Sequence, residues 1–210
     1  MPGCVIDFTN LNDMTYDCGL NFTGGLKTIK LMEKSEWDGA IEDATPEIEF
    51  AAAVAADPTA TPPVVGSPAQ FDFAAGVSAI SLITAADVLT LGFNNKDGFS
   101  NFSDVKTVNA DGSASAVPTV QVEFARMSAQ LRNDLDALAT GGGEMVAIVE
   151  TAAGTVHAIG TEFGLYAGTV DGATGASRTD KNRYQLTLTG EENSLSYGVS
   201  SALWTAIKAL

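Results

Sequence analysis

Few residues of this chain have the types and spacing that chemistry requires. His157 is the only histidine among 210 residues, and it stands in an apolar run between Val156 and Ala158. A Ser-His-Asp triad or a Cys-His pair would have to form around it. The sequence has no Gly-x-Ser-x-Gly turn to carry a nucleophile, and Cys4 and Cys18 lie in an expected N-terminal arm. We therefore expect no catalytic residue and no enzymatic activity.

Patterns for sugar hydrolysis, metals or phosphate are equally weak. Glu47 and Glu49 share one face of an expected strand, and paired carboxylates can cleave a glycosidic bond, but an acidic chain offers many such pairs. Residues 94–98 have the composition of a calcium loop without its spacing, and the glycines at 141–143 lack the Lys-Ser/Thr ending of a phosphate loop. One histidine and two cysteines do not supply a zinc-ligand set. We expect no metal and no cofactor.

The charge is strongly one-sided. The chain has 26 Asp and Glu against 11 Lys and Arg, a formal net charge of -15. Such a field repels phosphate and anionic lipid, so specific binding to nucleic acid or to a membrane surface is not expected, whereas passing contact with DNA is compatible with it. No segment has the ~18–20 apolar residues of a membrane span, and the first 20 residues lack the pattern of a secretory signal. We expect synthesis in the cytoplasm and no membrane span.

The most regular part of the sequence is residues 119–150, which predict a strand, an amphipathic helix and a second strand. Apolar and polar residues alternate over residues 120–124, and residues 145–149 are all apolar, as in a strand buried on both faces. Between them Ser128 can cap a helix that the glycines at 141–143 end. The apolar stripe of this helix, expected to pack on the sheet, is Met127, Leu131, Leu135 and Leu138.

Other strands are predicted by alternation at residues 26–33, 47–50, 70–83, 155–159, 163–169 and 184–189. A turn is expected at residues 37–40, a strand or a short helix at 195–210, an arm at 1–23, and long loops at 57–69 and 94–118. The fold class is mainly β (α+β): a single domain over residues 1–210, built as a β-sandwich or barrel with one packed amphipathic helix.

Two groups of side chains suggest contacts with other subunits. Long loops inside a compact domain often become ordered against a partner, and the loop at 94–118 carries Phe99 and Phe102. Arg178, Lys181 and Arg183 form a small basic cluster in an acidic chain, which favours contact with acidic loops of a neighbour.

Residues 119–199 resemble the tail tube proteins of tailed bacteriophages. The resemblance rests on the order TVQVEFARM, SAQLRNDLDALA, a Gly-rich turn, EMVAIVE, GTVHAIG, EFGLYAGT, a polar loop and LTLTGEE. It implies a virion structural protein, assembled in the host cytoplasm, that self-associates into stacked hexameric rings, contacts other tail proteins and lets DNA pass. In such a tube Glu47 and Glu49 are expected to line the lumen. A tail ring or adaptor protein is the first alternative, and a sugar-binding β-sandwich module is the second.

Overall fold

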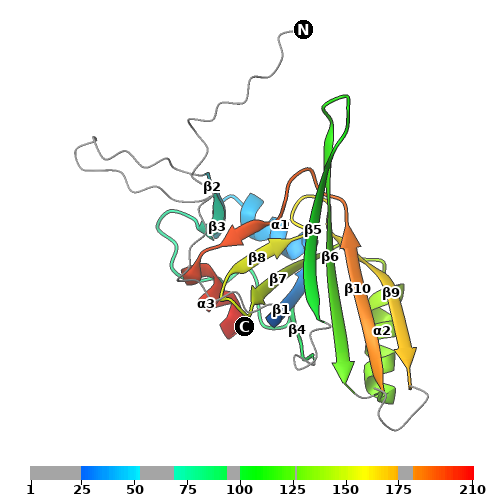
Figure 1. Ribbon diagram of the computed structural model, residues 1–210. Coiled ribbons are helices and arrows are strands. Elements are labelled where there is room, and N and C mark those ends of the chain that lie inside the picture. The colour runs from blue at the N-terminus through cyan, green and yellow to red at the C-terminus, as the bar shows by residue number, and fades with distance from the viewer. Residues whose placement is uncertain (1–24, 53–68, 94–99, 126, 175–181) are drawn as a thin grey trace.

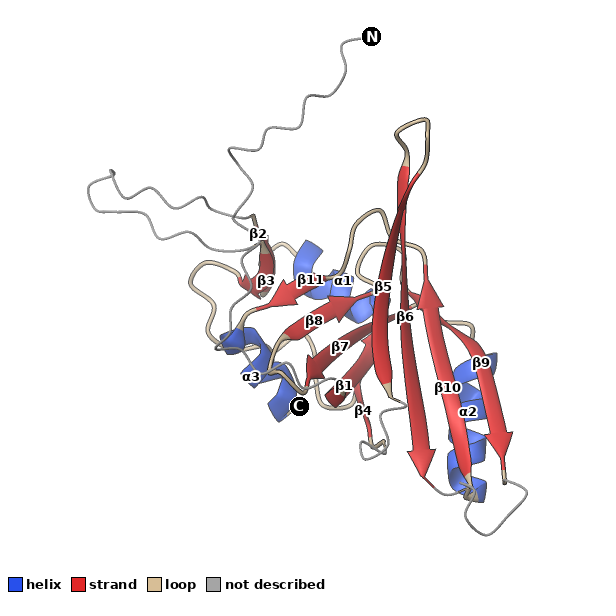
Figure 2. Ribbon diagram, in the orientation of Figure 1, coloured by secondary structure: helices blue, strands red, loops and turns tan. Residues whose placement is uncertain are grey.

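The computed structural model of the protein describes residues 25–52, 69–93, 100–125, 127–174 and 182–210. In this part of the chain, eleven strands form one mixed sheet and three helices pack against it (Figure 1, Figure 2). The strands are β1 (Leu26–Glu33), β2 (Ile48–Ala51), β3 (Gln70–Phe73), β4 (Val88–Leu91), β5 (Asn101–Val108), β6 (Ala114–Ala125), β7 (Met145–Thr151), β8 (Val156–Ile159), β9 (Leu165–Ala173), β10 (Arg183–Gly190) and β11 (Tyr197–Val199). The helices are α1 (Lys34–Glu42), α2 (Ala129–Thr140) and α3 (Ser201–Ala209). The predicted mainly β, α+β class is confirmed, with three helices where one was expected.

Strand β7 lies at the centre of the sheet. It pairs with β1 along its length and with β8 over residues 147–150, while a single pair, Met145 with Leu165, joins it to β9. From β9 the sheet continues through β10 and β6 to β5, and from β8 through β11 and β3 to β2. β4 extends it beyond β1. Among the described strands only β3 and β11 pair in parallel.

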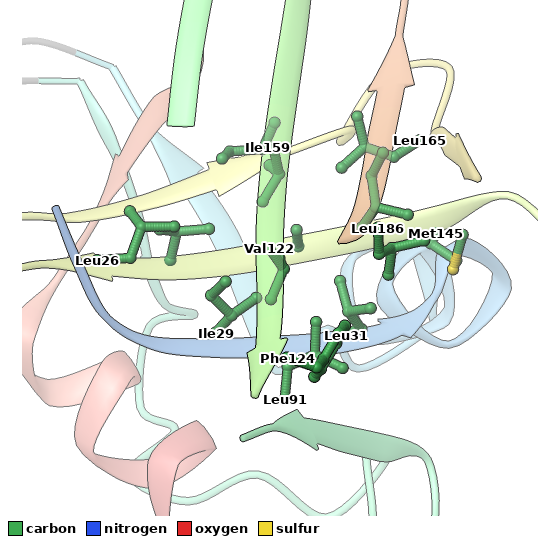
Figure 3. Close-up of a cluster of buried hydrophobic side chains, with 14 of the residues drawn as sticks. Leu26, Ile29, Leu31, Leu91, Val122, Phe124, Met145, Ile159, Leu165 and Leu186 are labelled. Carbon is green, nitrogen blue, oxygen red and sulfur yellow. The ribbon is translucent and has the colours of Figure 1, made fainter. Parts of the chain in front are cut away.

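The single pair at Met145 lets the sheet turn back on itself, so that β6 crosses over β1 and β7 (Figure 3). Gly160 lies at this turn with φ +80°, and a Cβ there would come within 2.7 Å of the Met145 carbonyl oxygen. The two layers enclose a cluster of buried apolar side chains, which includes Leu26, Ile29, Leu31, Val122, Phe124, Leu186 and Leu188. The fold is therefore held by one sheet packed face to face on itself.

A second apolar cluster lies on the other side of β7, under α1 and α3. Val146 and Ile148 point into it, whereas Ala147 and Val149 point into the cluster between the sheet layers. This alternation explains why β7 is apolar throughout, as the sequence predicted for a strand buried on both faces.

Three of the four residues of the predicted stripe, Leu131, Leu135 and Leu138, pack on the sheet from helix α2. The Ser128 side chain accepts a hydrogen bond from the Leu131 backbone N–H at 3.1 Å, which caps the first turn. Leu135 is buried, and Leu131 and Leu138 pack against the cluster between the sheet layers. Met127 precedes the helix and its methyl group lies over β9.

The predicted loop at residues 94–118 is wrong where the structure describes it. Residues 101–108 form β5, which pairs with β6 from the Asn101–Gln121 pair to the Val108–Ala114 pair. The strands were not predicted because much of this hairpin is exposed on both faces. Its sequence therefore lacks the alternation of apolar and polar residues that predicts a strand. Residues 94–99 lie outside the described part.

Two further segments differ from expectation. The turn predicted at residues 37–40 is wrong, since these residues lie inside α1. Trp37 and Ala40 are three residues apart and are both buried, as expected for one face of a helix. Residues 195–210, which predicted a strand or a helix, contain both β11 and α3. The predicted arm at 1–23 and nearly all of the predicted loop at 57–69 fall outside the described residues.

Candidate self-association surface

Strands β5, β6, β10 and β9 present one face to the core and leave the other open (Figure 2). Val120, Val122, Leu186 and Leu188 belong to the cluster between the layers, so their neighbours along each strand point outward. In register, the two middle rows of this open face read Ser103, Thr119, Thr189, Tyr166 and Asn101, Gln121, Thr187, Thr169. The open face is thus polar and uncharged at its centre.

The hairpin of β5 and β6 extends well beyond the other described strands and helices (Figure 1). Ala116 fixes its root, since the backbone N–H and C=O of Ala116 exchange hydrogen bonds of 2.7 and 2.8 Å with Glu192. Beyond this bridge lies the hairpin tip, residues 106–115, where Val108 is 68% exposed. Val105 and Val117, a cross-strand pair at the root, are also exposed. Exposed aliphatic side chains in neighbouring positions are a feature of protein interfaces.

A groove with a volume of about 580 Å³ lies beside the hairpin root. Its exposed apolar side chains are Val117, Phe163 and Tyr166, the last two being 51% and 43% exposed. The complete lining is Ser115, Val117, Phe163, Tyr166, Thr189, Gly190, Glu191, Glu192 and Asn193. Two large aromatic side chains on the wall of an open groove are suited to contact with another molecule.

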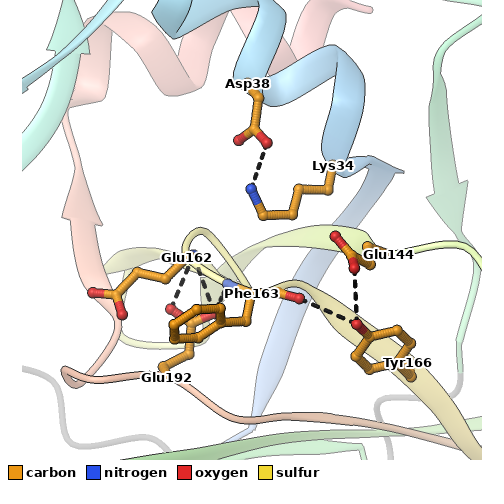
Figure 4. A network of polar contacts seen from close by, with 7 residues as sticks. All are labelled: Lys34, Asp38, Glu144, Glu162, Phe163, Tyr166 and Glu192. Carbon is orange, nitrogen blue, oxygen red and sulfur yellow. Dashed lines mark hydrogen bonds and ion pairs between the residues drawn. The ribbon is translucent and has the colours of Figure 1, made fainter.

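Two glutamates fix the wall of the groove in place (Figure 4). The Glu192 carboxylate accepts hydrogen bonds from the backbone N–H groups of Glu162 and Phe163, at 3.1 and 3.4 Å. In return the Glu162 carboxylate accepts from the Asn193 N–H at 2.8 Å and from the Ser194 hydroxyl at 2.9 Å. Burial raises the pKa of Glu192 although these N–H groups oppose the shift. The reciprocal bonds tie the turn that carries Phe163 to the root of the hairpin.

Tyr166 is held in place by a further glutamate, Glu144. Its hydroxyl donates to the Glu144 carboxylate at 2.9 Å, and this bond raises the pKa of Tyr166 (Figure 4). The ring is therefore oriented before any partner arrives, which reduces the entropy lost on binding.

Of the five predicted contact residues, only Phe102 and Arg183 lie in the described part of the chain. Phe99, Arg178 and Lys181 lie outside the described residues. Phe102 packs against the core cluster, with its ring centroid 5.6 Å from that of His157. Arg183 contacts its own chain, since its guanidinium pairs with the buried Glu123 carboxylate at 2.9 Å. The surface of this chain offers instead the hairpin and the groove.

The predicted lumen acids need a correction. Glu47 is only 8% exposed, and its carboxylate accepts hydrogen bonds from the backbone N–H groups of Ser81 and Leu82, at 2.7 and 2.9 Å, and from the Ser81 hydroxyl. Burial opposes ionisation, but these bonds outweigh it and lower the pKa of Glu47. Glu47 therefore fastens a loop, and only Glu49 is exposed as expected.

Among the described residues, the other acidic side chains do not gather on the open sheet face. That face carries Asp171 and the paired Glu123, whereas four acidic residues lie on α1 or directly after it. These four are Glu36, Asp38, Glu42 and Asp43.

No catalytic or metal-binding arrangement is found in the described residues. His157 is half-buried, and its Nδ1 atom, like the Oδ1 atom of nearby Asp104, has no hydrogen-bond partner. In the same part of the chain no three His, Cys, Asp or Glu side chains are grouped as metal ligands. No helix among these residues has the length and apolar character needed to cross a membrane.

Val108, Phe163 and Tyr166 are the surface residues that the sequence did not single out. A weak signal was present, since three valines, Val105, Val108 and Val117, interrupt an otherwise polar segment. These valines are exposed because the hairpin projects from the rest of the sheet. The sequence pattern does not predict this projection.

Comparison of the chain with protein-family models, with curated proteins and with solved structures gives no match.

Proposed function

We propose that the chain is a structural subunit of a bacteriophage tail tube, whose copies associate into stacked rings around a channel for DNA. The observation that carries the proposal is the projecting hairpin beside a groove with exposed aromatic side chains, on a molecule with an open sheet face. Such surfaces are costly in a monomer, because exposed apolar groups and open strands invite association. The resemblance of residues 119–199 to tail tube proteins is the reason that we propose stacked rings as the form of the assembly.

The charge of the chain supports the same function. A net charge of -15 disfavours retention of DNA, because phosphate meets like charge and no bound cations are released on contact. We assign the wall of the channel to the part of the open sheet face away from the groove, where the uncharged row Asn101, Gln121, Thr187 and Thr169 lies. Passage without specific binding is the expected relation to DNA, and the other partners are copies of the chain and further tail proteins. A tail ring or adaptor protein would use the same surfaces.

The test is the mass and shape of the purified protein. Light scattering over a range of concentrations should detect species larger than a monomer, and negative-stain electron microscopy should show rings or tubes. A protein that stays monomeric at the highest concentration, and also in the presence of preformed tail initiation complexes, would contradict the proposal.

A further inference from the structure

The hairpin tip combines apolar and basic character on one face. Lys106 and Val108 are two residues apart in β5 and therefore point to the same side, where they face Ala116 and Ala114 across the hairpin. Lys106 is exposed, and within the described residues it forms no ion pair. It is also the one basic residue among residues 100–125.

The groove has the complementary character. Its apolar lining is formed by Val117, Phe163 and Tyr166, and its acidic lining residues, called the rim below, are Glu191 and Glu192. Glu192 at this rim is already engaged by backbone N–H groups. Glu191 is exposed and has no partner among the described residues, so the rim offers one unpaired negative charge.

The end of the hairpin tip that carries Val108 does not reach the groove of its own molecule, although Ser115 at the base of the tip lines this groove. Val117 belongs to the same hairpin and lines that groove, and the bridge between Ala116 and Glu192 fixes the root. Val108 lies three residues beyond the Val105–Val117 pair, which places it roughly 10 Å farther along an extended strand. A paired hairpin does not fold back over that distance, so Val108 cannot occupy the groove of its own molecule.

We propose that the hairpin tip of one copy of this chain inserts into the groove of the next copy, with Val108 against Phe163 and Tyr166 and with Lys106 paired to Glu191. The two surfaces differ, so the contact is head-to-tail and repeats from copy to copy, which produces a closed ring or an open filament. This inference rests on the proposed function and names the contact through which the subunits associate.

A charge exchange tests the contact. Lys106→Glu should place two like charges at the rim and raise the concentration of half-assembly by about tenfold or more, and Glu191→Lys should do the same by facing Lys106 with another cation. The double variant Lys106→Glu with Glu191→Lys restores an opposite pair and should return assembly to within about threefold of the unmodified protein.

The control variants make the same two kinds of charge reversal at positions outside the proposed contact. Arg132→Glu and Asp136→Lys alter the exposed face of α2 by the same amounts and should leave assembly unchanged. Circular dichroism of each variant establishes that it folds. If the unmodified protein assembles but the double variant is no better than either single variant, the hairpin and groove contact is wrong and the proposed function stands. If the unmodified protein stays monomeric both alone and with preformed tail initiation complexes, the proposed function fails, and this contact fails with it.

Discussion

Glu150 of β7 links the central strand to the C-terminal helix through one lysine and to β1 through another. Its carboxylate accepts a hydrogen bond from Lys208 of α3 at 2.8 Å and another from Lys27 of β1. Burial of Glu150 opposes ionisation, but the hydrogen bonds and charges of the two lysines lower its pKa to about 2. The folded protein therefore holds this carboxylate ionised where an unfolded chain would protonate it.

The consequence is a loss of stability in acid. The ordinary pKa of the group is 4.5, so its contribution is fully present above that pH and is lost as the pH falls toward 2. Glu150→Gln should lower the free energy of unfolding by about 1–2 kcal/mol at pH 7, a figure reduced because both lysines are solvent-exposed. Urea unfolding at pH 7 and pH 3 measures it, with Asp136→Asn as control. A deficit of equal size at both pH values would show that the lysines are not responsible.

His157 should titrate below the ordinary histidine range. Burial disfavours the imidazolium form more than the Asp104 carboxylate favours it, which lowers the pKa of His157 from 6.5. Stability is therefore fully present above pH 6.5 and decreases as the pH falls from there toward the lowered pKa, because only the unfolded chain gains the proton. Since the chain has one histidine, its ring protons give a single NMR titration curve.

A second variant isolates the role of Asp104. Asp104→Asn removes the negative charge but keeps an oxygen that can accept the hydrogen bond from the Ser196 N–H. The pKa of His157 should then fall further. A titration at or above 6.5 in the unmodified protein would mean that the ring is hydrated or paired with Asp104.

Glu47 illustrates which residues the sequence could not place. Alternation with Ile48 predicts an exposed carboxylate. The groups that bury it belong to Ser81 and Leu82, 34 and 35 residues farther along the chain. A local pattern carries no information about such a distant partner.

At the level of elements, α2 offers the clearest test of packing. Leu135 is 3% exposed in the cluster between the sheet layers. Leu135→Ala should lower the free energy of unfolding by about 2–5 kcal/mol, the range for a buried leucine replaced by alanine. The neighbouring Asp136 is exposed, so Asp136→Ala should change it by less than about 0.5 kcal/mol. Equal effects in urea unfolding would mean that the apolar stripe does not face the sheet.

Helices and strands with one buried and one exposed face could be predicted from the sequence, whereas the other elements could not. Strand β10 and helix α2 each have one buried face, so their sequences alternate with the correct period. Helix α1 has only nine residues and includes a glycine, so its pattern is short. It is stabilised by contact of Trp37 with Phe71, whose ring centroids lie 5.1 Å apart in an edge-to-face arrangement. The hairpin tip has no buried face and therefore no pattern.

At the scale of the whole molecule, folding and association use separate surfaces. The buried clusters lie between the sheet layers and under α1 and α3, while the hairpin tip contributes nothing to either of them. Sequence patterns that detect buried residues therefore could not predict the candidate interface. It was identified from the position of the hairpin in the folded molecule (Figure 1).

The separation predicts that the hairpin can be shortened without unfolding the protein. Replacing residues 108–114 with Asn-Gly joins Thr107 to Ser115, a hydrogen-bonded pair of the hairpin, by a two-residue turn of the kind that closes antiparallel hairpins, and it keeps the bridge from Ala116 to Glu192. Because no side chain of the removed segment belongs to a core cluster, the free energy of unfolding should change by less than about 1 kcal/mol. Assembly, measured by light scattering at the same concentrations, should be lost, since the variant lacks Val108 and most of the arm that reaches the next copy. A shortened protein that is stable and still assembles would move the interface away from the hairpin, most directly to the open face of β5, β6, β10 and β9.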